Sequence, residues 1–371
     1  TVTFSPDPAA TYYTTVNVSL ATIIAGATVH YEVGGAEATC SSTEFSADIP
    51  VAAQSIVAIN AVSCVDGEVS GSSVSEAYLS APVLVGQYDT PNNAEGVAVN
   101  GTIAYVADTN GDDLQIIDVS DPGNPSLANQ IDPFGNTRKV DVEGTRLYAA
   151  TGGTGFAYYD ISSPTSPNLV NSADPGTGVA SDVVASGNTA YVVSSGGGAA
   201  PDLTIYDVSG AAMLQGTDDT AVGRGVVVSG TTAYLAVGTA GIRVLDVSTP
   251  TTPALITTAT ATDARGVYLD NGRLYVADNG GGMRIFDTSM ALLGQYTAAT
   301  SGLRVFARDN VAYLADGTNG LEIIDVTNPA APTQLAAYST GGVSAIDITV
   351  SGNFAYMAVD TSGLLIFQIS K

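Results

Sequence analysis

Four of the nine arginines in this 371-residue chain recur at nearly the same position of a repeated pattern. Arg138, Arg224 and Arg265 each precede a tyrosine by ten residues, and Arg304 precedes one by nine. A guanidinium group binds carboxylate, phosphate or sulfate through paired, charge-assisted hydrogen bonds. If the repeats surround a common axis, these side chains point towards one channel mouth, where they form a positively charged site for an anion.

The alternative interpretation is that the arginines stabilise the fold. An aspartate ends the strand that is antiparallel to the arginine-bearing strand, and so lies near a guanidinium group, at Asp108, Asp278, Asp316 and Asp360. Pairs of this kind would hold neighbouring strands together without binding a ligand. The sequence leaves both interpretations open and favours the structural pairing.

A second pattern of oxygen-bearing residues suggests calcium. Asp108, Asn110 and Asp112 are spaced like the first ligands of a calcium loop. The twelfth residue of that loop would be Val119, where a complete loop requires an acidic residue. Because Gly-rich turns occupy the same place in other repeats, an ordinary hairpin turn is the favoured interpretation. No other cofactor is suggested.

The residue inventory excludes much catalytic chemistry. The chain has one His, two Cys and no Trp. A three-histidine metal site is therefore impossible, and a nucleophilic triad would depend on His30 alone. We expect a protein that binds rather than catalyses. A polysaccharide lyase or hydrolase that uses Asp, Tyr and Arg remains the enzymatic alternative.

Residues 81–371 contain seven repeats, and the gaps between their marker tyrosines are 43, 43, 43, 41, 38 and 43 residues. A period of about 42 residues is typical of one four-stranded sheet of a β-propeller. Short apolar runs separated by Gly, Asn and Asp turns, with no sustained helical period, predict an all-β fold. We therefore expect a seven-bladed β-propeller. The marker tyrosines are Tyr105, Tyr148, Tyr191, Tyr234, Tyr275, Tyr313 and Tyr356.

An aspartate ends the third strand in six of the seven repeats, and a Pro-x-x-Pro pair follows in four of them. A carboxylate at a turn accepts backbone N–H groups, and prolines fix an extended link. We interpret this repeated feature as a folding device. The six aspartates are Asp118, Asp160, Asp207, Asp246, Asp287 and Asp325.

The segments LQIIDVSDPGNP (114–125), GIRVLDVSTPTTP (241–253) and GLEIIDVTNPAAP (320–332) resemble LVIVD-repeat β-propellers. The resemblance covers 81–371 and implies the propeller fold, but little about activity. The chain ends in the third strand of the last repeat, whereas the segment 83–88 resembles the fourth strands of other repeats. We therefore expect 83–88 to complete the last sheet and close the ring.

Residues 1–80 follow a different pattern, with short alternating runs and no Lys or Arg. These runs predict a small β-sandwich. Residues 5–78 are similar to the immunoglobulin-like module at the C-terminus of chitobiases and β-hexosaminidases. That module recurs as an accessory in secreted bacterial proteins. The resemblance implies an Ig-fold accessory domain without glycosidase activity, because the catalytic barrel is absent.

The only two cysteines, Cys40 and Cys64, both lie in this first region. An even pair in a small sandwich predicts one disulfide, and two buried free thiols are the alternative. A disulfide, like the resemblance, implies an extracellular or cell-surface location. Asn17 and Asn100 begin Asn-x-Ser/Thr sequences that match N-glycosylation acceptors, a short motif that also occurs by chance.

The formal net charge of −25 argues against nucleic acid and anionic lipid as partners. No apolar run is long enough to insert into a membrane. We expect a structural or adhesive protein that binds copies of itself, as a filament or surface layer, or other surface proteins and glycans. Residues 1–6 and the sandwich edges are the candidate contacts. The alternative is a ligand-binding propeller that captures an anion or carbohydrate at the arginine-lined mouth.

Overall fold

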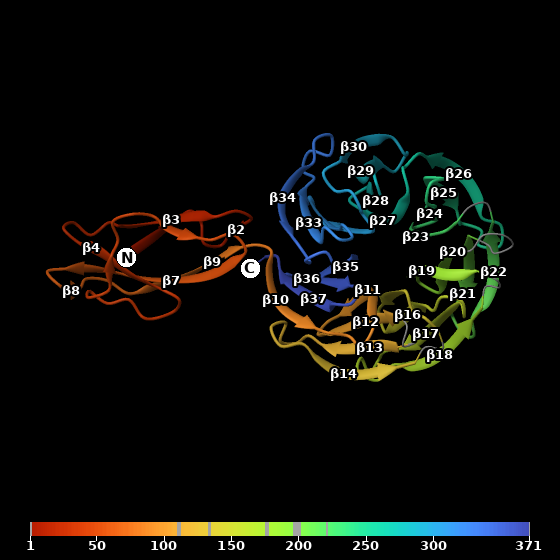
Figure 1. Ribbon diagram of the computed structural model, residues 1–371, viewed down its shortest axis with the longest axis horizontal. Coiled ribbons are helices and arrows are strands. Elements are labelled where there is room, and N and C mark those ends of the chain that lie inside the picture. Colours follow the sequence, from red (N-terminus) through yellow and green to blue (C-terminus); the bar gives the residue numbers. More distant parts are fainter. Residues whose placement is uncertain are drawn as a thin grey trace. The chain divides into compact units, whose positions relative to one another are not determined.

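The computed structural model (Figure 1) describes residues 2–109, 113–132, 135–174, 178–195, 202–219 and 222–370. Every regular element in these ranges is a β-strand, which confirms the all-β prediction. Within the same ranges there is no helix long and apolar enough to span a membrane. The chain divides into two compact units, 1–85 with 367–371 and 86–366.

Unit 1 contains two sheets. The first has three strands in the order β1 (Val2–Ser5), β3 (Val16–Thr22) and β6 (Ile49–Val51). The second has the order β2 (Thr11–Tyr12), β9 (Val74–Ser80), β7 (Ser55–Val65), β4 (Thr28–Val33) and β5 (Thr43–Glu44), and β8 (Glu68–Val69) pairs with β7.

One apolar core joins the two sheets of unit 1. Val18 and Val51 of the first sheet are fully buried in the same cluster as Ile59 and Tyr78 of the second. Cys40 and Cys64 form a disulfide, as predicted, with their Cα atoms 5.8 Å apart. This bond ties the loop between β4 and β5 to β7 and constrains the unfolded chain of a small unit.

The rest of the chain forms seven four-stranded antiparallel sheets, which we number in chain order. Sheet 1 contains β11 (Asn93–Asn100), β12 (Ile103–Thr109), β13 (Asp113–Asp118) and β14 (Ser126–Ile131). Sheet 2 contains β15 (Lys139–Glu143), β16 (Arg146–Ala150), β17 (Phe156–Asp160) and β18 (Asn168–Ala173). Sheet 3 contains β19 (Val179–Ser186), β20 (Thr189–Ser195), β21 (Leu203–Asp207) and β22 (Met213–Asp218).

The remaining sheets repeat this order. Sheet 4 contains β23 (Gly225–Ser229), β24 (Thr232–Ala236), β25 (Ile242–Asp246) and β26 (Ala254–Ala259). Sheet 5 contains β27 (Ala264–Asp270), β28 (Arg273–Asp278), β29 (Gly282–Asp287) and β30 (Leu292–Tyr296). Sheet 6 contains β31 (Arg304–Arg308), β32 (Val311–Ala315), β33 (Leu321–Asp325) and β34 (Thr333–Tyr338). Sheet 7 contains β35 (Ala345–Ser351), β36 (Phe354–Val359) and β37 (Gly363–Gln368), and its fourth strand is β10 (Val83–Tyr88), which pairs with β37.

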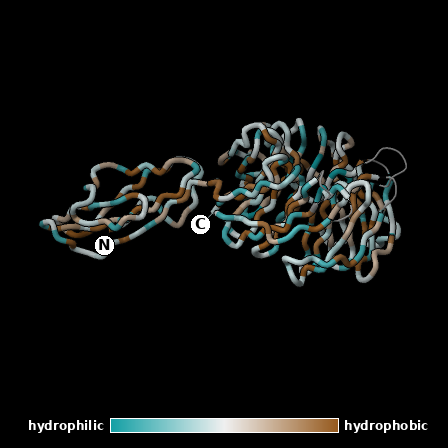
Figure 2. The backbone as a smooth tube through the Cα atoms, turned by 60° about the horizontal axis from the view of Figure 1, so that its bottom comes forward, coloured by the Kyte–Doolittle hydropathy of each residue, from teal (hydrophilic) through white to brown (hydrophobic). Residues whose placement is uncertain are grey.

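The seven sheets form a β-propeller-like ring (Figure 1). The first strands of successive sheets pack against one another, and β35 packs against β11, so the ring is closed. Apolar clusters fill the space between neighbouring sheets; one of them joins Tyr105 and Ile116 of sheet 1 to Leu147 and Tyr159 of sheet 2. Hydrophobic and hydrophilic stretches alternate along the chain throughout the ring (Figure 2).

The marker tyrosines have a structural explanation. All seven are buried between sheets, at most 5 % exposed. The Tyr105 hydroxyl donates a hydrogen bond to the carbonyl of Pro164 in the next repeat, at 2.8 Å. The Tyr148 hydroxyl, by contrast, is buried without a hydrogen-bond partner among the described residues, so what the seven tyrosines share is their packing between neighbouring sheets.

The turn after the third strand is built the same way in six sheets. The aspartate Oδ1 accepts the backbone N–H two residues further on, for example Ser120 N to Asp118 at 2.8 Å and Ser248 N to Asp246 at 2.8 Å. The other four make the same bond at 2.8 to 2.9 Å. Hydrogen bonds from the turn lower the pKa of each of the six carboxyl groups; the backbone bond is the largest cause at four of them, and a side-chain hydroxyl is the largest at Asp287 and Asp325. The carboxylate therefore stabilises the turn.

Candidate functional site

The strand register defines two levels of equivalent residues at one end of the channel. In each sheet the marker tyrosine, on the second strand, pairs with one residue of the first strand. The residue two positions before that partner belongs to the level that we call the floor. The floor residues are Gly96, Lys139, Asp182, Gly225, Gly266, Arg304 and Asp347. The level that we call the mouth contains the residue immediately before each of these: Glu95, Arg138, Ser181, Arg224, Arg265, Leu303 and Ile346. Three of the four singled-out arginines therefore belong to the mouth, and Arg304 belongs to the floor.

A local irregularity of the first strands shapes the mouth. In sheets 1, 3, 5 and 7 the pairing of the first and second strands shifts at the mouth residue, which is the extra residue of a β-bulge. A bulged residue leaves the alternation of the strand and can turn its side chain in a new direction. At Arg265 the bulge lets the side chain reach the mouth although Gly266 already occupies the floor.

All seven mouth residues line one cavity of about 280 Å³, together with Arg304. The side chains of Arg138, Arg224 and Arg265 are 42 %, 33 % and 31 % exposed. Two acidic groups lie among them, Glu95 and Asp263, and Asp182 lies beside Arg304, so four arginines face three acids and an excess of one positive charge remains. In a molecule of net charge −25 this is a local reversal of sign.

Asp263 forms hydrogen bonds to Arg265 but not to Arg224. Arg265 donates to Asp263 Oδ2 from Nε at 2.8 Å, and its Nη2 lies 2.6 Å from the same oxygen. Arg224 Nε lies 3.7 Å from Asp263 Oδ1, beyond hydrogen-bond distance. Both atoms are buried and have no hydrogen-bond partner among the described residues. Burial and the nearby Arg265 and Arg304 cations lower the pKa of the Arg224 guanidinium, and the Asp263 carboxylate offsets part of this.

Arg138 is the second arginine of the mouth that lies near an acid without forming a hydrogen bond to it. Its Nη1 lies 3.6 Å from Glu95 Oε2, again longer than a hydrogen bond. Burial raises the pKa of the Glu95 carboxyl, and the Arg138 charge offsets only part of that rise. Arg138 and Arg224 are thus the two mouth arginines with donors to offer an incoming anion.

Arg304 extends across the channel beneath the mouth. From sheet 6 its Nη1 donates to the carbonyl of Arg265 at 2.6 Å, and its Nη2 donates to the carbonyl of Arg224 at 3.1 Å. Its Nη2 also lies 3.8 Å from Asp182 of sheet 3. A Cβ atom at Gly266 would lie 2.9 Å from Arg304 Cδ, so glycine leaves the room that this side chain needs.

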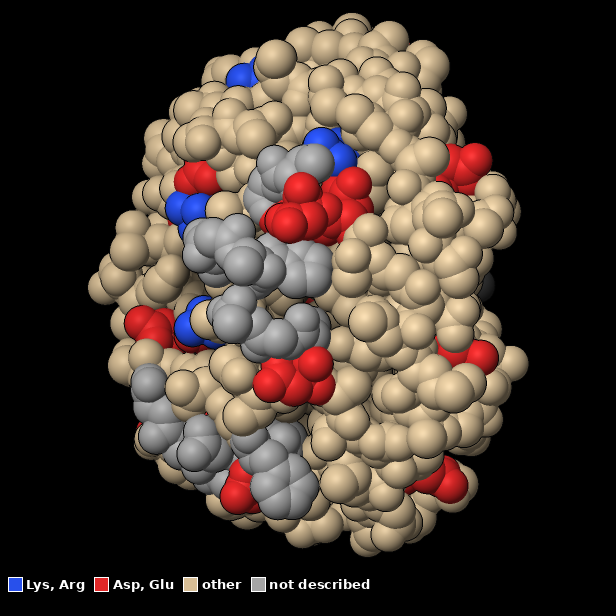
Figure 3. Space-filling model, turned by 90° about the vertical axis from the view of Figure 1, so that its right-hand side faces the viewer, with Lys and Arg blue, Asp and Glu red and all other residues tan. Residues whose placement is uncertain are grey.

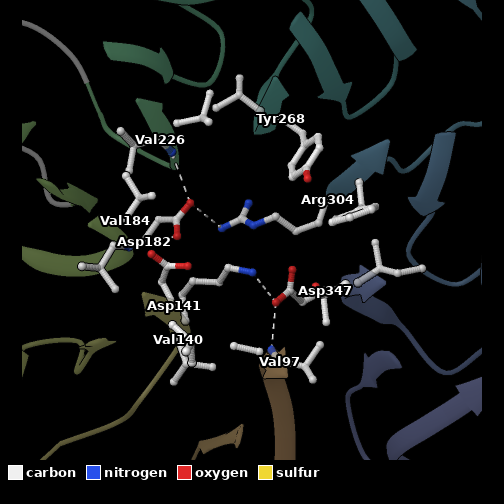
Figure 4. Close-up of a pocket in the computed structure, with 18 of the residues that line it drawn as sticks. Val97, Val140, Asp141, Asp182, Val184, Val226, Tyr268, Arg304 and Asp347 are labelled. Atoms are coloured by element: carbon white, nitrogen blue, oxygen red, sulfur yellow. Dashed lines mark hydrogen bonds and ion pairs between the residues drawn. The ribbon is translucent and has the colours of Figure 1, made fainter. Parts of the chain in front are cut away.

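The other floor charges link different sheets around the channel (Figure 4). Lys139 pairs with the nearly fully buried Asp347, which also accepts the N–H of Val97 at 2.8 Å. Asp182 accepts the N–H of Val226 at 3.2 Å. Beyond the floor lies a second cavity of about 290 Å³, also lined by Arg304 and the other floor charges and bordered by Asp141. We interpret these contacts as the means by which the channel end is held together.

Comparison with known proteins identifies the repeats. Seven segments match the LVIVD repeat, at residues 91–132, 134–174, 177–214, 223–260, 261–298, 303–340 and 342–371. The chain belongs to the LVIVD repeat family. Each LVIVD segment begins close to the first strand of one sheet, so the mouth residues lie near the start of each repeat. The predicted LVIVD resemblance is thereby confirmed for these segments.

Solved structures with similar folds share little sequence with the LVIVD repeats. A chain of the mitotic checkpoint complex is 13 % identical, with a TM-score of 0.66 over 78 % of this chain and 92 % of that one. The computationally designed Ika8 protein is 8 % identical, with a TM-score of 0.57 over 78 % of this chain and 100 % of that one. No curated protein sequence matches this chain. The likenesses concern the fold alone.

The alternative interpretation of the arginines assigned them different partners. Asp278 binds Arg284 Nε at 2.6 Å and accepts the N–H of Asp263 at 2.7 Å. Asp316 accepts the N–H of Ser301 at 2.6 Å, in the corresponding turn of the next LVIVD repeat. These aspartates therefore fix the loop that leads into the first strand. The acids beside the mouth and floor arginines are Glu95, Asp263 and Asp182 instead.

The calcium pattern falls mostly outside the described residues, because Asn110 and Asp112 are not among them. Asp108 is fully buried, and its two carboxylate oxygens accept the N–H of Asn92 at 3.1 and 3.2 Å. Among the described residues no group of three or more His, Cys, Asp or Glu side chains could hold a metal ion. Asp108 resembles Asp278 and Asp316 in this loop-fixing contact.

The two glycosylation motifs lie on strands. Asn17 is exposed on β3. Asn100 ends β11 and donates to the carbonyl of Gly144 at 3.4 Å. Glycosylation of either asparagine stays a prediction.

Two functional contacts were missed by the sequence reasoning. Glu95 precedes its marker tyrosine by ten residues, the same offset as the arginines, so an alignment of all seven repeats would have found it. Asp263 does not stand at this offset from a marker tyrosine, so the spacing could not have identified it. It lies two residues before Arg265, and only the bulge at Arg265 brings the two side chains together.

Proposed function

We propose that this protein acts outside the cell by binding, without catalysis, and that the mouth holds an anionic group of its ligand. The observation that carries the proposal is the set of arginines around one cavity, among which the Arg224 side chain is 33 % exposed and lies beyond hydrogen-bond distance of Asp263. Its Nε is closed off from solvent, so a ligand oxygen would contact the exposed part of the side chain and offset its charge.

The charge balance of the mouth favours a monoanion. Arg265 is neutralised by Asp263, and Arg138 is partly neutralised by Glu95. One positive charge remains, centred near Arg224. Charge-assisted hydrogen bonds are each worth about 1.5 to 3 kcal/mol, and part of this offsets the free energy lost on association, so contacts from Arg138 and Arg224 predict weak binding of a small anion.

Calorimetric titration with acetate and with sulfate tests the proposal. We expect saturable binding by the full chain and a loss of at least about tenfold in affinity for Arg224→Gln and for Arg138→Gln. Arg308→Gln is the matched control, because Arg308 lies at the other end of β31 and donates to the carbonyl of Gly352. Anion binding that is equal in all four proteins, or absent from the wild type, would contradict the proposal.

The extracellular location is also proposed. The Cys40–Cys64 disulfide is the type of bond that persists in oxidising compartments. We propose further that unit 1 is an immunoglobulin-like sandwich of the type found at the C-terminus of chitobiases and β-hexosaminidases. Its two sheets around one core support that assignment.

A second candidate function is self-association, as a filament or a surface layer. The outermost strands of the ring expose large apolar side chains in five successive sheets: Leu127, Leu169, Val170, Met213, Leu214, Leu255, Ile256 and Leu292. These strands carry no Lys or Arg and a single acidic residue, Asp218. Charges are also sparse on the face shown in Figure 3. Two copies of a strongly acidic molecule approach most easily through such uncharged strands.

Light scattering over a range of concentrations tests self-association. We expect the mass to rise with concentration, and the double change Leu214→Lys and Ile256→Lys to keep the protein monomeric. A monomer at every concentration would remove this candidate. It would leave anion binding at the mouth untouched, because the outer strands and the mouth share no residue.

A further inference from the structure

We propose that the ligand of the mouth is a sugar acid, a ring that bears one carboxylate and several hydroxyl groups, and that a single terminal ring enters end-on. This inference rests on the proposed anion site and specifies its substrate class.

The mouth is divided into a cationic side and an apolar side. In ring order, Arg138, Ser181, Arg224 and Arg265 come from sheets 2 to 5, and the aliphatic side chains of Leu303 and Ile346 come from sheets 6 and 7. Both aliphatic side chains are half-buried and border the cavity. A ligand with its carboxylate at Arg224 would therefore place its carbon skeleton against an apolar wall.

Outside the arginines, the polar groups of the mouth are chiefly acceptors. Ser181 Oγ donates its hydrogen to the carbonyl of Gly223 at 2.8 Å, and Ser195 Oγ donates to the carbonyl of Val179 at 3.4 Å. Their lone pairs stay available, and so do those of Glu95 Oε2, whereas Glu95 Oε1 already accepts a hydrogen bond from Thr109 Oγ1 at 3.4 Å. A ligand that satisfies them must bring hydrogen-bond donors. Hydroxyl groups on a ring meet this need, whereas acetate, sulfate and phosphate bring no comparable array.

The floor limits how far a ligand can enter. Arg304 lines both the mouth cavity and the second cavity, and its guanidinium is fixed to the carbonyls of Arg224 and Arg265. A volume of about 280 Å³ lies at the low end for small-molecule sites. The mouth is therefore a shallow pocket closed by a side chain, which suits one terminal ring and not a polymer threaded along the axis.

Parallel titrations with D-glucuronate, D-glucose and acetate test the inference. We expect glucuronate to bind at least about tenfold more tightly than acetate, and glucose to show no binding, because it lacks the carboxylate. Arg224→Gln should abolish glucuronate binding. Ser344→Ala, which removes one hydroxyl that borders the cavity, should weaken glucuronate severalfold and leave acetate unchanged. Arg308→Gln should bind all three probes like the wild type.

The results separate failure of the substrate class from failure of the anion site. Equal affinity for acetate and glucuronate, lost together in Arg224→Gln, would overturn the sugar acid and keep the anion site. No binding of acetate, sulfate or glucuronate would overturn both. A peptide with a free C-terminal carboxylate that binds more tightly than glucuronate, while its amidated form does not bind, would replace the sugar acid with a peptide ligand.

Discussion

Six of the seven sheets place the same residue at the turn after the third strand, whereas the seven mouth positions hold five residue types. In the turns, each aspartate makes the same bond to the backbone N–H two residues away, as at Asp118 and Asp246. In the mouth, Glu95, Ser181, Leu303 and Ile346 stand where other sheets have arginine. The two regions belong to the same repeat, but the residue type is nearly constant at the turn and varies at the mouth.

This difference distinguishes folding from binding. The aspartate that recurs in six sheets has the same local task in each of them, because each of these sheets forms the same turn. A ligand breaks that symmetry, since it has one orientation and needs different groups on different sides. The arginines occupy one side of the mouth and the aliphatic residues another, an asymmetry that the proposed ligand would use.

The floor residues vary between sheets, as the mouth residues do, but their charges pair within the protein, as the turn aspartates bond within their turns. Changes at the floor should therefore have the largest effect on the free energy of unfolding. Lys139→Met removes the cation that pairs with Asp347, whose side chain is 1 % exposed. Leaving a buried carboxylate without its cation should lower the free energy of unfolding by about 3 kcal/mol. Urea unfolding measures this loss. The double variant with Asp347→Asn should recover part of it, and a single variant as stable as the wild type would show that the pair does not hold the ring.

Asp141 should give a smaller effect with a characteristic pH dependence. Burial, only partly offset by the Ala185 N–H and the Lys139 charge, raises the pKa of its carboxyl to about 6. The native state then binds a proton more tightly than the unfolded chain, so this group's contribution to stability is present below about pH 4 and is lost as the pH rises through 6.

Asp141→Asn should therefore stabilise the protein by about 1 to 2 kcal/mol at pH 7 and by nothing at pH 4. The amide oxygen can still accept the N–H of Ala185, the backbone bond of the native carboxylate. Denaturant unfolding at the two pH values measures the difference. A variant that is destabilised equally at both would show that the ionised carboxylate is needed for folding.

The smallest effect is expected at a single turn aspartate. Asp246→Ala removes one acceptor from the exposed turn of sheet 4 and should lower Tm slightly, with no change in ligand affinity. The depressed pKa of Asp246 means that its contribution is present above its unfolded pKa and is lost as the pH falls through the folded one. The Tm difference between variant and wild type should therefore narrow in acid. A difference that widens in acid would contradict this assignment.

The features that could be predicted from the sequence are those that recur at a fixed spacing in the repeats. The tyrosine spacing located the seven repeats, and Arg138, Arg224 and Arg265 proved to line one cavity because an equal offset means an equivalent place in each sheet. Arg304 was predicted at the mouth with the other three, and the structure corrects this by placing it one level deeper, as its offset of nine residues allows. The Arg265–Asp263 contact was beyond reach, because β-bulges depend on tertiary packing and leave no spacing pattern.

The most direct test measures ligand affinity and Tm side by side in Arg224→Gln and Asp246→Ala. The account predicts that Arg224→Gln loses binding of the anionic ligand at an unchanged Tm, while Asp246→Ala lowers Tm and binds like the wild type. If Arg224→Gln unfolds the ring, or if it binds glucuronate and acetate as well as the wild type does, the mouth belongs to the folding apparatus and the distinction between the two regions fails.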